Sequence, residues 1–194
     1  MTDGVPTRQT TDVELSDEQL LALINGGDLA AFESLAVRYQ KSALRLARRF
    51  VGDEHEAEDM AQEAFLQVYR TAHQFRSDAT FKTWFFRILT NLCLNQLKKK
   101  RPEYFDDPPV EIQAGDDPAR AFERREQRRA IFRAVLELPP KQRMAFILCS
   151  FEELSYAEAA HSLGISVKAV ESLLVRARRT LREELSALRK NISD

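Results

Sequence analysis

The sequence of 194 residues contains little glycine and proline, with only six glycines and seven prolines. No proline lies between Pro6 and Pro102, and none follows Pro140. Such stretches favour helices over β-sandwiches and barrels, in which glycine and proline recur at the turns. The same composition excludes collagen, disulfide scaffolds and glycine-rich nucleotide-binding folds.

Long apolar runs are also missing, since runs such as residues 146–149 span only a few positions. A membrane-spanning helix needs about 20 apolar residues, so no direct membrane insertion is predicted. Residues 1–14 are polar and lack the apolar stretch of a secretory signal. The two cysteines, Cys93 and Cys149, lie too far apart in sequence to form a metal-ligand or redox pair, and we expect two small buried thiols. The expected location is the cytoplasm.

Signatures of catalysis are absent as well. The sequence contains no GxxxxGK[ST] and no GxGxxG run. Its three histidines, His55, His73 and His161, have no cysteine or second histidine at the spacing of metal ligands. We therefore expect no enzyme activity, no catalytic residue, no metal site and no cofactor.

The net charge of −1 hides an uneven distribution along the chain. Residues 1–101 carry 14 basic and 14 acidic residues, residues 102–121 carry one and six, and residues 122–194 carry 14 and 10. Within the first segment, residues 81–101 hold six basic residues and no acidic one. Two basic regions with an acidic stretch between them indicate two nucleic-acid contacts on one chain.

Hydrophobic residues make up 44% of the chain and recur at helical intervals over most of its length. The stretch from Pro102 to Ala119 is different, because it has no periodicity and holds four prolines, a glycine and six acidic residues. The predicted fold is all-α, with two small helical domains joined by a flexible acidic linker. Its four predicted segments are a disordered tail (1–14), a first domain (15–101), the linker (102–120) and a second domain (121–194).

The strongest local pattern lies between Leu154 and Val170. Ser155 and Glu158 form a capping box that begins a helix, as Ser16 and Gln19 do near the start of the chain. Ala160 is small enough for two helices to cross closely, and Gly164 permits a left-handed turn. This spacing predicts a helix-turn-helix, whose second helix enters the major groove of DNA, although an ordinary helical hairpin with a solvated charged face is the alternative.

The second helix of this pattern has two sides at 100° per residue. Its predicted buried side consists of Val170, Leu173, Leu174, Ala177 and Leu181. The opposite side is basic and polar, as a DNA-reading surface requires. It carries Lys168, Glu171, Ser172, Val175, Arg176 and Arg179.

A second pattern covers residues 81–101, where a predicted helix has two ridges. The predicted buried ridge consists of Phe81, Phe85, Ile88, Leu89 and Leu92. Amide and guanidinium groups beside aromatic rings suit unstacked bases, which need a face to stack on and an edge to hydrogen-bond. Such groups form the other ridge, which consists of Trp84, Arg87, Asn91, Asn95 and Lys98. Aromatic residues at helical spacing also occur in cores, so a structural role for Trp84 stays open.

A third pattern is an acidic helix start at residues 56–63. Asp59, Gln62 and Glu63 share one polar face of this helix, which suits arginines of a partner protein. Acidic residues at a helix start can also simply offset the helix dipole.

In order along the chain, these patterns resemble an extracytoplasmic-function sigma factor, the two-domain class of bacterial transcription initiation factor. Residues 58–65 resemble the polymerase-binding helix of that family, and residues 75–91 resemble its promoter-melting loop and −10-reading helix. Residues 138–143 and the helix-turn-helix resemble its −35-reading domain. The resemblance extends from about Ser16 to Leu188.

The resemblance implies a factor that directs bacterial core RNA polymerase to specific promoters, is a monomer when free, and is held by an anti-sigma factor, often a membrane-tethered one. The polymerase partners would be the clamp helices of the β′ subunit, bound by Asp59, Gln62 and Glu63, and the β flap. The −35 duplex would be read by the exposed side of the helix-turn-helix. The melted −10 strand, with one flipped base, would be bound by Phe75, Arg76, Ser77, Lys82, Trp84, Arg87, Asn91 and Asn95.

Two positions depart from the family pattern. Glu171 stands where members often carry a basic residue, and Ser77 stands where many have glycine. A carboxylate repels phosphates but accepts a hydrogen bond from a cytosine amino group, so we expect a shifted −35 preference. Two other functions stay open at this stage: a stand-alone helix-turn-helix regulator, which would bind duplex DNA tightly by itself, and an RNA-binding helical protein.

Overall fold

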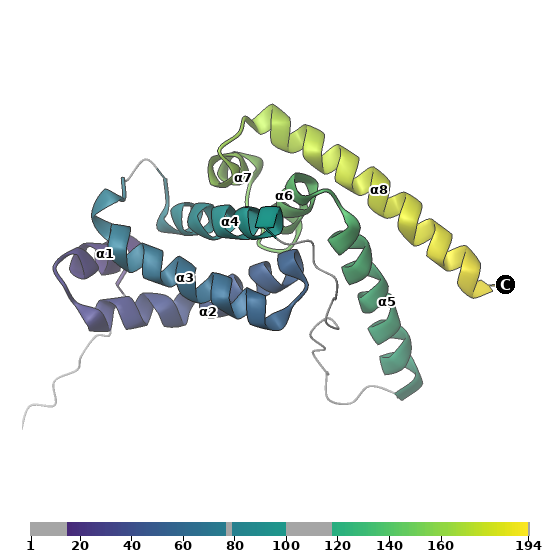
Figure 1. The fold of residues 1–194 in the computed structure, drawn as a ribbon, viewed down its shortest axis with the longest axis horizontal. Helices are drawn as coiled ribbons and strands as arrows, with labels where there is room; N and C mark the ends of the chain where they lie inside the picture. Colours follow the sequence, from purple (N-terminus) through teal and green to yellow (C-terminus); the bar gives the residue numbers. More distant parts are fainter. Residues whose placement is uncertain (1–14, 77–78, 100–117, 194) are drawn as a thin grey trace, which may run out of the picture.

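The computed structural model describes residues 15–76, 79–99 and 118–193 (Figure 1). Every regular element in these ranges is helical, which confirms the predicted all-α fold. The predicted tail, Ser77, and residues 102–117 of the predicted linker lie outside the described residues. The elements are α1 (Asp17–Asn25), α2 (Leu29–Val51), α3 (Glu54–Thr71), the 3₁₀ helix η1 (Ala72–Gln74), α4 (Phe81–Lys99), α5 (Pro118–Glu137), α6 (Pro140–Ser150), α7 (Tyr156–Leu163) and α8 (Val167–Ser193).

The helix ends follow local sequence signals. Capping boxes are present at Ser16 and Ser155, where the sequence predicts them. Gly52 ends α2 in the left-handed conformation, with φ of 83°. The structure begins α3 two residues earlier than predicted, because the Asp53 carboxylate accepts a hydrogen bond from the Glu56 N–H (2.7 Å) and so caps the helix.

Helices α1–α4 form a first unit around aromatic side chains. The turn at Gly52 brings α3 back along α2, and α4 packs on both helices. The ring of Phe81 lies 5.1 Å from that of Tyr39 and stacks on Phe85 at 5.9 Å. Phe50 and both of these phenylalanines of α4 are fully buried. Aromatic side chains therefore supply much of the apolar area that this unit removes from water.

Helices α5–α8 form a second unit, in which α8 packs on α5, α6 and α7. The predicted crossing of the helix-turn-helix is confirmed, since Ala160 is 5% exposed and Val170 is fully buried. Gly164 joins the two helices with φ of 64°. The chain thereby turns sharply from α7 into α8, as the pattern of small, glycine and apolar residues predicts.

Helix α4 is buried on two sides, and the sequence predicts only one of them. Phe81, Phe85 and Leu89 are buried as expected, whereas Ile88 and Leu92 are half-buried. Phe86 and Cys93 are fully buried although they lie outside the predicted ridge. The reason is that α4 packs on α2 and α3 and also on α6 and α7 of the second unit (Figure 1).

Gly164 provides a test of the turn. At φ of 64° a residue with a Cβ is strained, although no atom lies within 4 Å of where that Cβ would stand. We expect Gly164→Val to lower the free energy of unfolding by roughly 1–2 kcal/mol, and Gly164→Asn to lower it less because asparagine tolerates this conformation. Urea unfolding of the three proteins measures both values. Equal losses for the two variants would contradict strain as the reason for the glycine.

Candidate nucleic-acid interface

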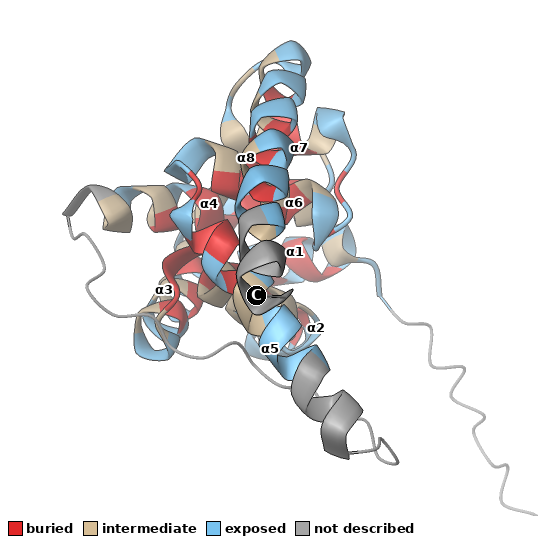
Figure 2. Cartoon of the chain, turned by 90° about the vertical axis from the view of Figure 1, so that its right-hand side faces the viewer, coloured by how far each residue is buried: buried red, intermediate tan, exposed pale blue. Residues whose placement is uncertain are grey.

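The side of α8 that faces away from the second unit carries all six residues predicted to read duplex DNA. Every one of them is exposed, and Val175 is 66% exposed. Val170, Leu174 and Ala177 are buried on the opposite side, so the exposed face can bind a ligand without disturbing the core. Figure 2 shows exposed and buried stretches alternating along α8. The six residues are Lys168, Glu171, Ser172, Val175, Arg176 and Arg179.

Arg176 and Ser172 are joined within this face. The Arg176 Nη2 donates to the Ser172 hydroxyl oxygen (2.9 Å), and its Nε donates to the Ser172 carbonyl (3.2 Å). These contacts hold the guanidinium against one turn of the exposed side. Less side-chain entropy is then lost when the group binds a base edge or a phosphate.

The orientation of α8 depends on how α7 begins and ends. The Glu158 carboxylate accepts hydrogen bonds from the Ser155 hydroxyl (2.6 Å) and backbone N–H (2.8 Å), and these contacts lower the pKa of Glu158. The ionised carboxylate then lies at a helix N-terminus, where the dipole favours negative charge. At the other end, the Ile165 N–H donates to the Ala160 carbonyl (3.0 Å) across the glycine turn. Both ends of α7 are thus held by hydrogen bonds.

Helix α4 presents a second candidate surface. Arg87, Asn91 and Asn95 are all exposed and lie four residues apart, which places them along one line about 12 Å long. Trp84 is half-buried beside this line, and its ring makes an edge contact with Phe75 at 5.5 Å. Trp84 therefore packs on neighbouring aromatic rings and also remains partly accessible. Arg76, in the preceding loop, is exposed.

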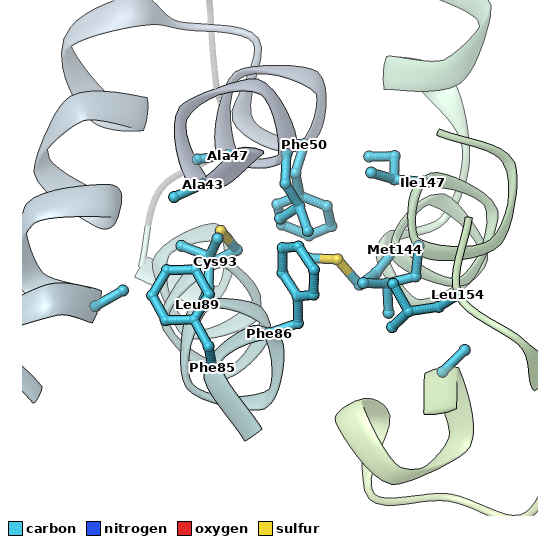
Figure 3. Close-up of a cluster of buried hydrophobic side chains, with 14 of the residues drawn as sticks. Ala43, Ala47, Phe50, Phe85, Phe86, Leu89, Cys93, Met144, Ile147 and Leu154 are labelled. Atoms are coloured by element: carbon cyan, nitrogen blue, oxygen red, sulfur yellow. The ribbon is translucent and has the colours of Figure 1, made fainter. Parts of the chain in front are cut away.

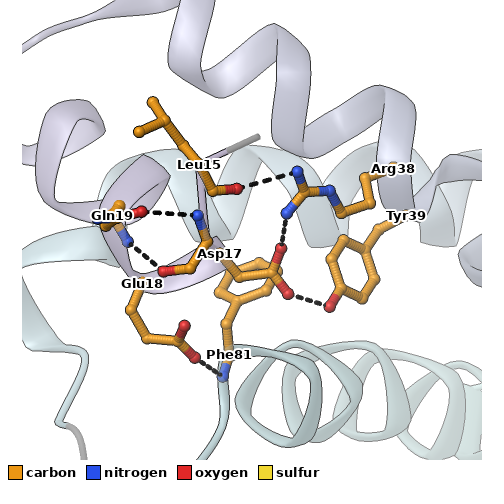
Figure 4. A network of polar contacts seen from close by, with 8 residues as sticks. Leu15, Asp17, Glu18, Gln19, Arg38, Tyr39 and Phe81 are labelled. Atoms are coloured by element: carbon orange, nitrogen blue, oxygen red, sulfur yellow. Dashed lines mark hydrogen bonds and ion pairs between the residues drawn. The ribbon is translucent and has the colours of Figure 1, made fainter. Parts of the chain in front are cut away.

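The start of α4 is held by α1, a role that the sequence did not indicate (Figure 4). The Phe81 N–H donates to the Glu18 carboxylate (3.3 Å), and hydrogen bonds from backbone N–H groups lower the pKa of Glu18. Asp17 forms an ion pair with Arg38 and accepts a hydrogen bond from the Tyr39 hydroxyl. These contacts fix α1 on α2, and α1 in turn caps α4. These contacts thereby position the loop before Phe81 and the exposed ridge of α4 after it.

Lys82, predicted as a −10 DNA contact, lies apart from the exposed ridge of α4. It is half-buried, and its Nζ donates to the backbone carbonyl of Glu152 in the second unit (3.2 Å). Ser77, also predicted for the −10 site, lies outside the described residues. The structure therefore brings Trp84, Arg87, Asn91 and Asn95 together on one side of α4 and directs Lys82 elsewhere.

Helix α3 carries the acidic face predicted for a protein partner. Asp59 and Gln62 are exposed. Glu63 is half-buried and forms an ion pair with Arg70 (3.4 Å). Such an ion pair near the surface contributes little to stability, so the carboxylate can exchange Arg70 for a basic group of a partner.

Two apolar residues continue this face, and the sequence analysis missed both. Leu66 is 46% exposed and follows Gln62 by four residues, so it lies next along the same ridge. Tyr69 is 43% exposed, although its ring contacts Phe32 edge-on at 5.3 Å. The sequence signal for the exposure of Leu66 was its spacing of four residues from Gln62, because this spacing places an apolar side chain on the polar face of the helix. The acidic face thus ends in an apolar patch.

The cysteine expectation holds for one residue and is partly wrong for the other. Cys93 is buried, and burial raises the pKa of its thiol to about 12. Cys149 is only half-buried. Within the described ranges, no group of three or more His, Cys, Asp or Glu side chains could hold a metal ion. No helix in the same ranges is long and apolar enough to cross a membrane.

Two segments of the chain match described protein families. Residues 35–103 match Sigma-70 region 2, and residues 128–181 match Sigma-70, region 4. The first segment contains α3 and α4, and the second contains the helix-turn-helix. Both regions on one chain favour a polymerase factor over a stand-alone regulator.

Individual proteins agree with these matches over nearly the whole chain. The RNA polymerase sigma-H factor of Pseudomonas aeruginosa is 37% identical over 184 residues, which cover 89% of this chain and 95% of that protein. The ECF RNA polymerase sigma factor SigW of Bacillus subtilis is 32% identical over 187 residues, covering 91% and 100%. The structure of CnrH, solved with the cytosolic domain of CnrY, has a TM-score of 0.68 and 27% identity, and covers 88% of this chain and 97% of that one. The chain therefore belongs to the ECF RNA polymerase sigma factors, a family without enzymatic activity that directs RNA polymerase to promoters.

Proposed function

We propose that this sigma factor reads the −35 element as duplex DNA with the exposed side of α8, and the melted −10 strand with the ridge Arg87–Asn91–Asn95 of α4. The acidic face of α3 binds the clamp helices of the polymerase β′ subunit. The observation that carries the proposal is the position of these three exposed surfaces. Each has the chemistry its ligand requires, and each lies within a matched sigma-70 region.

Several properties of α8 support −35 reading. Its exposed side combines three cations, Lys168, Arg176 and Arg179, with polar and apolar side chains. Arginine and lysine neutralise phosphates, and serine, glutamate and valine side chains can meet base edges and thymine methyl groups in the major groove. Glu171 faces the same side, so it meets a base or lies between phosphates. Only contact with a base would allow the Glu171 carboxylate to read the sequence.

The −10 site combines stacking surfaces with hydrogen-bonding groups. Trp84 and Phe75 are half-buried aromatic residues in mutual edge contact. Arg76 and Asn91 are exposed and supply a guanidinium and an amide, which can bind the edge of an extruded base. Stacking on aromatic rings and hydrogen bonds to base edges are the two contacts by which proteins hold single strands.

The acidic face of α3 supports binding to basic residues of the polymerase clamp. Asp59 and Gln62 are exposed, and Leu66 adds an apolar contact beside them. An interface that combines apolar contacts with charged ones gives both affinity and orientation. The second unit binds the β flap in this proposal.

Regulation by an anti-sigma factor is part of the proposal. CnrH, whose fold covers 88% of this chain, was solved with the cytosolic domain of CnrY, which indicates a partner with a further part outside the cytosol. We infer that this sigma factor is a cytoplasmic monomer when free. A comparable anti-sigma factor, of a kind that is often tethered to a membrane, holds it inactive.

Run-off transcription with purified core polymerase on a library of genomic promoters tests the proposed function. We expect new transcripts only when the protein is present. Asp59→Lys should abolish them and prevent co-purification with core polymerase, because a charge reversal inside an interface costs several kcal/mol, roughly 2–5. Glu33→Lys is the matched control, since it reverses an acidic charge in the same way at an exposed residue of α2. Polymerase binding by Asp59→Lys, with helical content unchanged, would contradict this role of α3.

Arg76→Ala and Asn91→Ala separate promoter melting from polymerase binding. We expect both variants to bind core polymerase normally and to form open complexes more slowly on duplex promoters, since one base contact contributes roughly 1–3 kcal/mol. A template with a premelted −10 bubble should restore part of the rate, because the base is already unpaired. Rates equal to the wild type on both templates would place the −10 pocket elsewhere.

Substitutions on the exposed side of α8 should have two kinds of effect on −35 binding, one on affinity and one on sequence preference. Arg179→Ala should weaken binding about equally on all sequences and lower the salt slope by about one, as expected for a phosphate contact. Glu171→Arg should change the selected −35 sequence at one position, from cytosine toward guanine. Selection from a randomised −35 library measures this change, and Glu183→Arg, an exposed residue farther along α8, is the control. An unchanged consensus for Glu171→Arg would mean that Glu171 reads no base.

A further inference from the structure

The loop between η1 and α4 is held at both of its ends by one short helix, α1. At the first end, the Asn25 Nδ2 donates to the Ala72 carbonyl of η1 (3.4 Å), and this carbonyl also accepts a hydrogen bond from the Phe75 N–H (3.1 Å). At the second end, the Glu18 carboxylate accepts the hydrogen bond from the Phe81 N–H (3.3 Å; Figure 4). The chain that carries Phe75 into the proposed −10 site therefore runs between two contacts with α1.

Helix α1 is itself fixed on the rest of the first unit, since its apolar side chains Leu20, Leu21 and Ile24 are buried. Glu18 and Asn25 lie seven residues apart, which places them two turns apart on one face of the helix. Both contacts are therefore made from a packed helix, at a spacing of about 10 Å along its axis. A fixed spacing between its two ends limits the arrangements that a loop can adopt.

The groups proposed to hold the flipped base are attached directly to these two ends. Phe75 follows η1, and its ring contacts the Trp84 ring of α4 edge-on at 5.5 Å. The Trp84 ring also lies 6.0 Å from that of Phe81, the residue whose N–H binds Glu18. The exposed Arg76 comes directly after Phe75. A movement of either end would therefore change the position of the aromatic pair and of the guanidinium.

The start of α4 also has a cap of its own, so it does not depend on α1 to form. The Thr83 N–H donates to the Thr80 hydroxyl oxygen (3.3 Å), as at an ordinary helix N-terminus. The contact with Glu18 adds a connection to α1. Hydrogen bonds from the backbone N–H groups of Glu18 itself and of Phe81 lower the pKa of Glu18. The carboxylate is therefore ionised at neutral pH, which makes it a strong acceptor for the Phe81 N–H.

We propose that α1 is a brace for the −10 site: Glu18 and Asn25 hold the two ends of the loop at the spacing that admits the flipped base, and so set how tightly that base is bound. This inference rests on the proposed −10 function of α4 and of the loop before it. Glu18 and Asn25 are positioning residues, which act through Phe75, Arg76 and Trp84. Because the loop is held in advance, less conformational entropy is lost when the base enters.

Binding of single-stranded −10 oligonucleotides to the holoenzyme of this protein and core polymerase tests the brace. The strands come from a promoter that the protein transcribes, and in each of them one base is replaced by an abasic site. The flipped base is the one whose removal weakens binding by the wild type most. Glu18→Ala and Asn25→Ala should bind the intact strand about threefold to tenfold more weakly, the usual effect of one lost hydrogen bond. Both should bind the strand without the flipped base as the wild type does.

Two further variants serve as controls. Glu18→Gln keeps an oxygen that can accept the Phe81 N–H, and it should bind the intact strand within about twofold of the wild type. It removes the same negative charge as Glu18→Ala, so an effect of that charge on DNA binding would be equal in both. Glu33→Ala removes a carboxylate from an exposed residue of α2 and should match the wild type. Because Glu18 and Asn25 are exposed, helical content and affinity for core polymerase should be unchanged in every variant.

Three outcomes separate the brace from the function on which it rests. Wild-type affinity of both alanine variants for the intact strand, or an equal loss on the intact and abasic strands, would overturn the brace alone. A loss in Glu18→Gln as large as in Glu18→Ala would also overturn it, because the effect would then come from charge and not from the hydrogen bond. A wild-type holoenzyme that binds every abasic strand as tightly as the intact strand would instead contradict the proposed −10 site.

Discussion

The burial of α4 on two sides is the constraint on which the rest of the structure depends. Phe81 and Phe85 contact aromatic rings of α2 and α3. On another side, Phe86 is buried beside Met144 of α6, while Cys93 lies beside Ala43 of α2 (Figure 3). A helix covered in this way keeps only a narrow exposed strip. In α4 this strip holds one arginine and two asparagines at four-residue spacing. Because the aromatic side chains on either side fix the rotation of the helix, they also fix the direction in which those polar groups point.

Two charged side chains bind the backbone groups at the ends of helices from distant segments of the chain. Glu18 of α1 accepts a hydrogen bond at the start of α4, and Arg143 of α6 donates to the carbonyls at the ends of α2 and α5. Helix ends leave backbone groups without intrahelical partners, and burial makes those groups costly unless another residue satisfies them. Two side chains from distant segments thus make it possible to bury three helix ends. The same contacts fix the positions of the surfaces assigned to DNA and polymerase.

The sequence predicted the parts of the fold that depend on neighbouring residues. The capping boxes at Ser16 and Ser155 and the glycine turn at Gly164 are local, so spacing alone identified them. The exposed side of α8 was predicted for the same reason. The contact of Arg143 with Phe50 joins residues 93 positions apart, and no local pattern indicates it. The family resemblance places Lys82 among the −10 contacts, whereas its hydrogen bond to the Glu152 carbonyl is visible only in the fold.

Glu152 is a buried carboxylate at the junction between the two units. Burial raises the pKa of its carboxyl from the ordinary value of 4.5, and Arg49, Arg45 and Lys82 oppose this rise while Glu153 adds to it. A raised pKa means that the packed arrangement binds the proton more tightly than a chain in which this carboxyl is exposed to water. Packing is therefore most favourable below pH 4.5 and weakens as pH rises through the raised pKa. At neutral pH the ionised carboxylate is held by its cations against the cost of its own burial. An apolar side chain at this position would bring no such cost, so the buried carboxylate makes the junction weaker than apolar packing would.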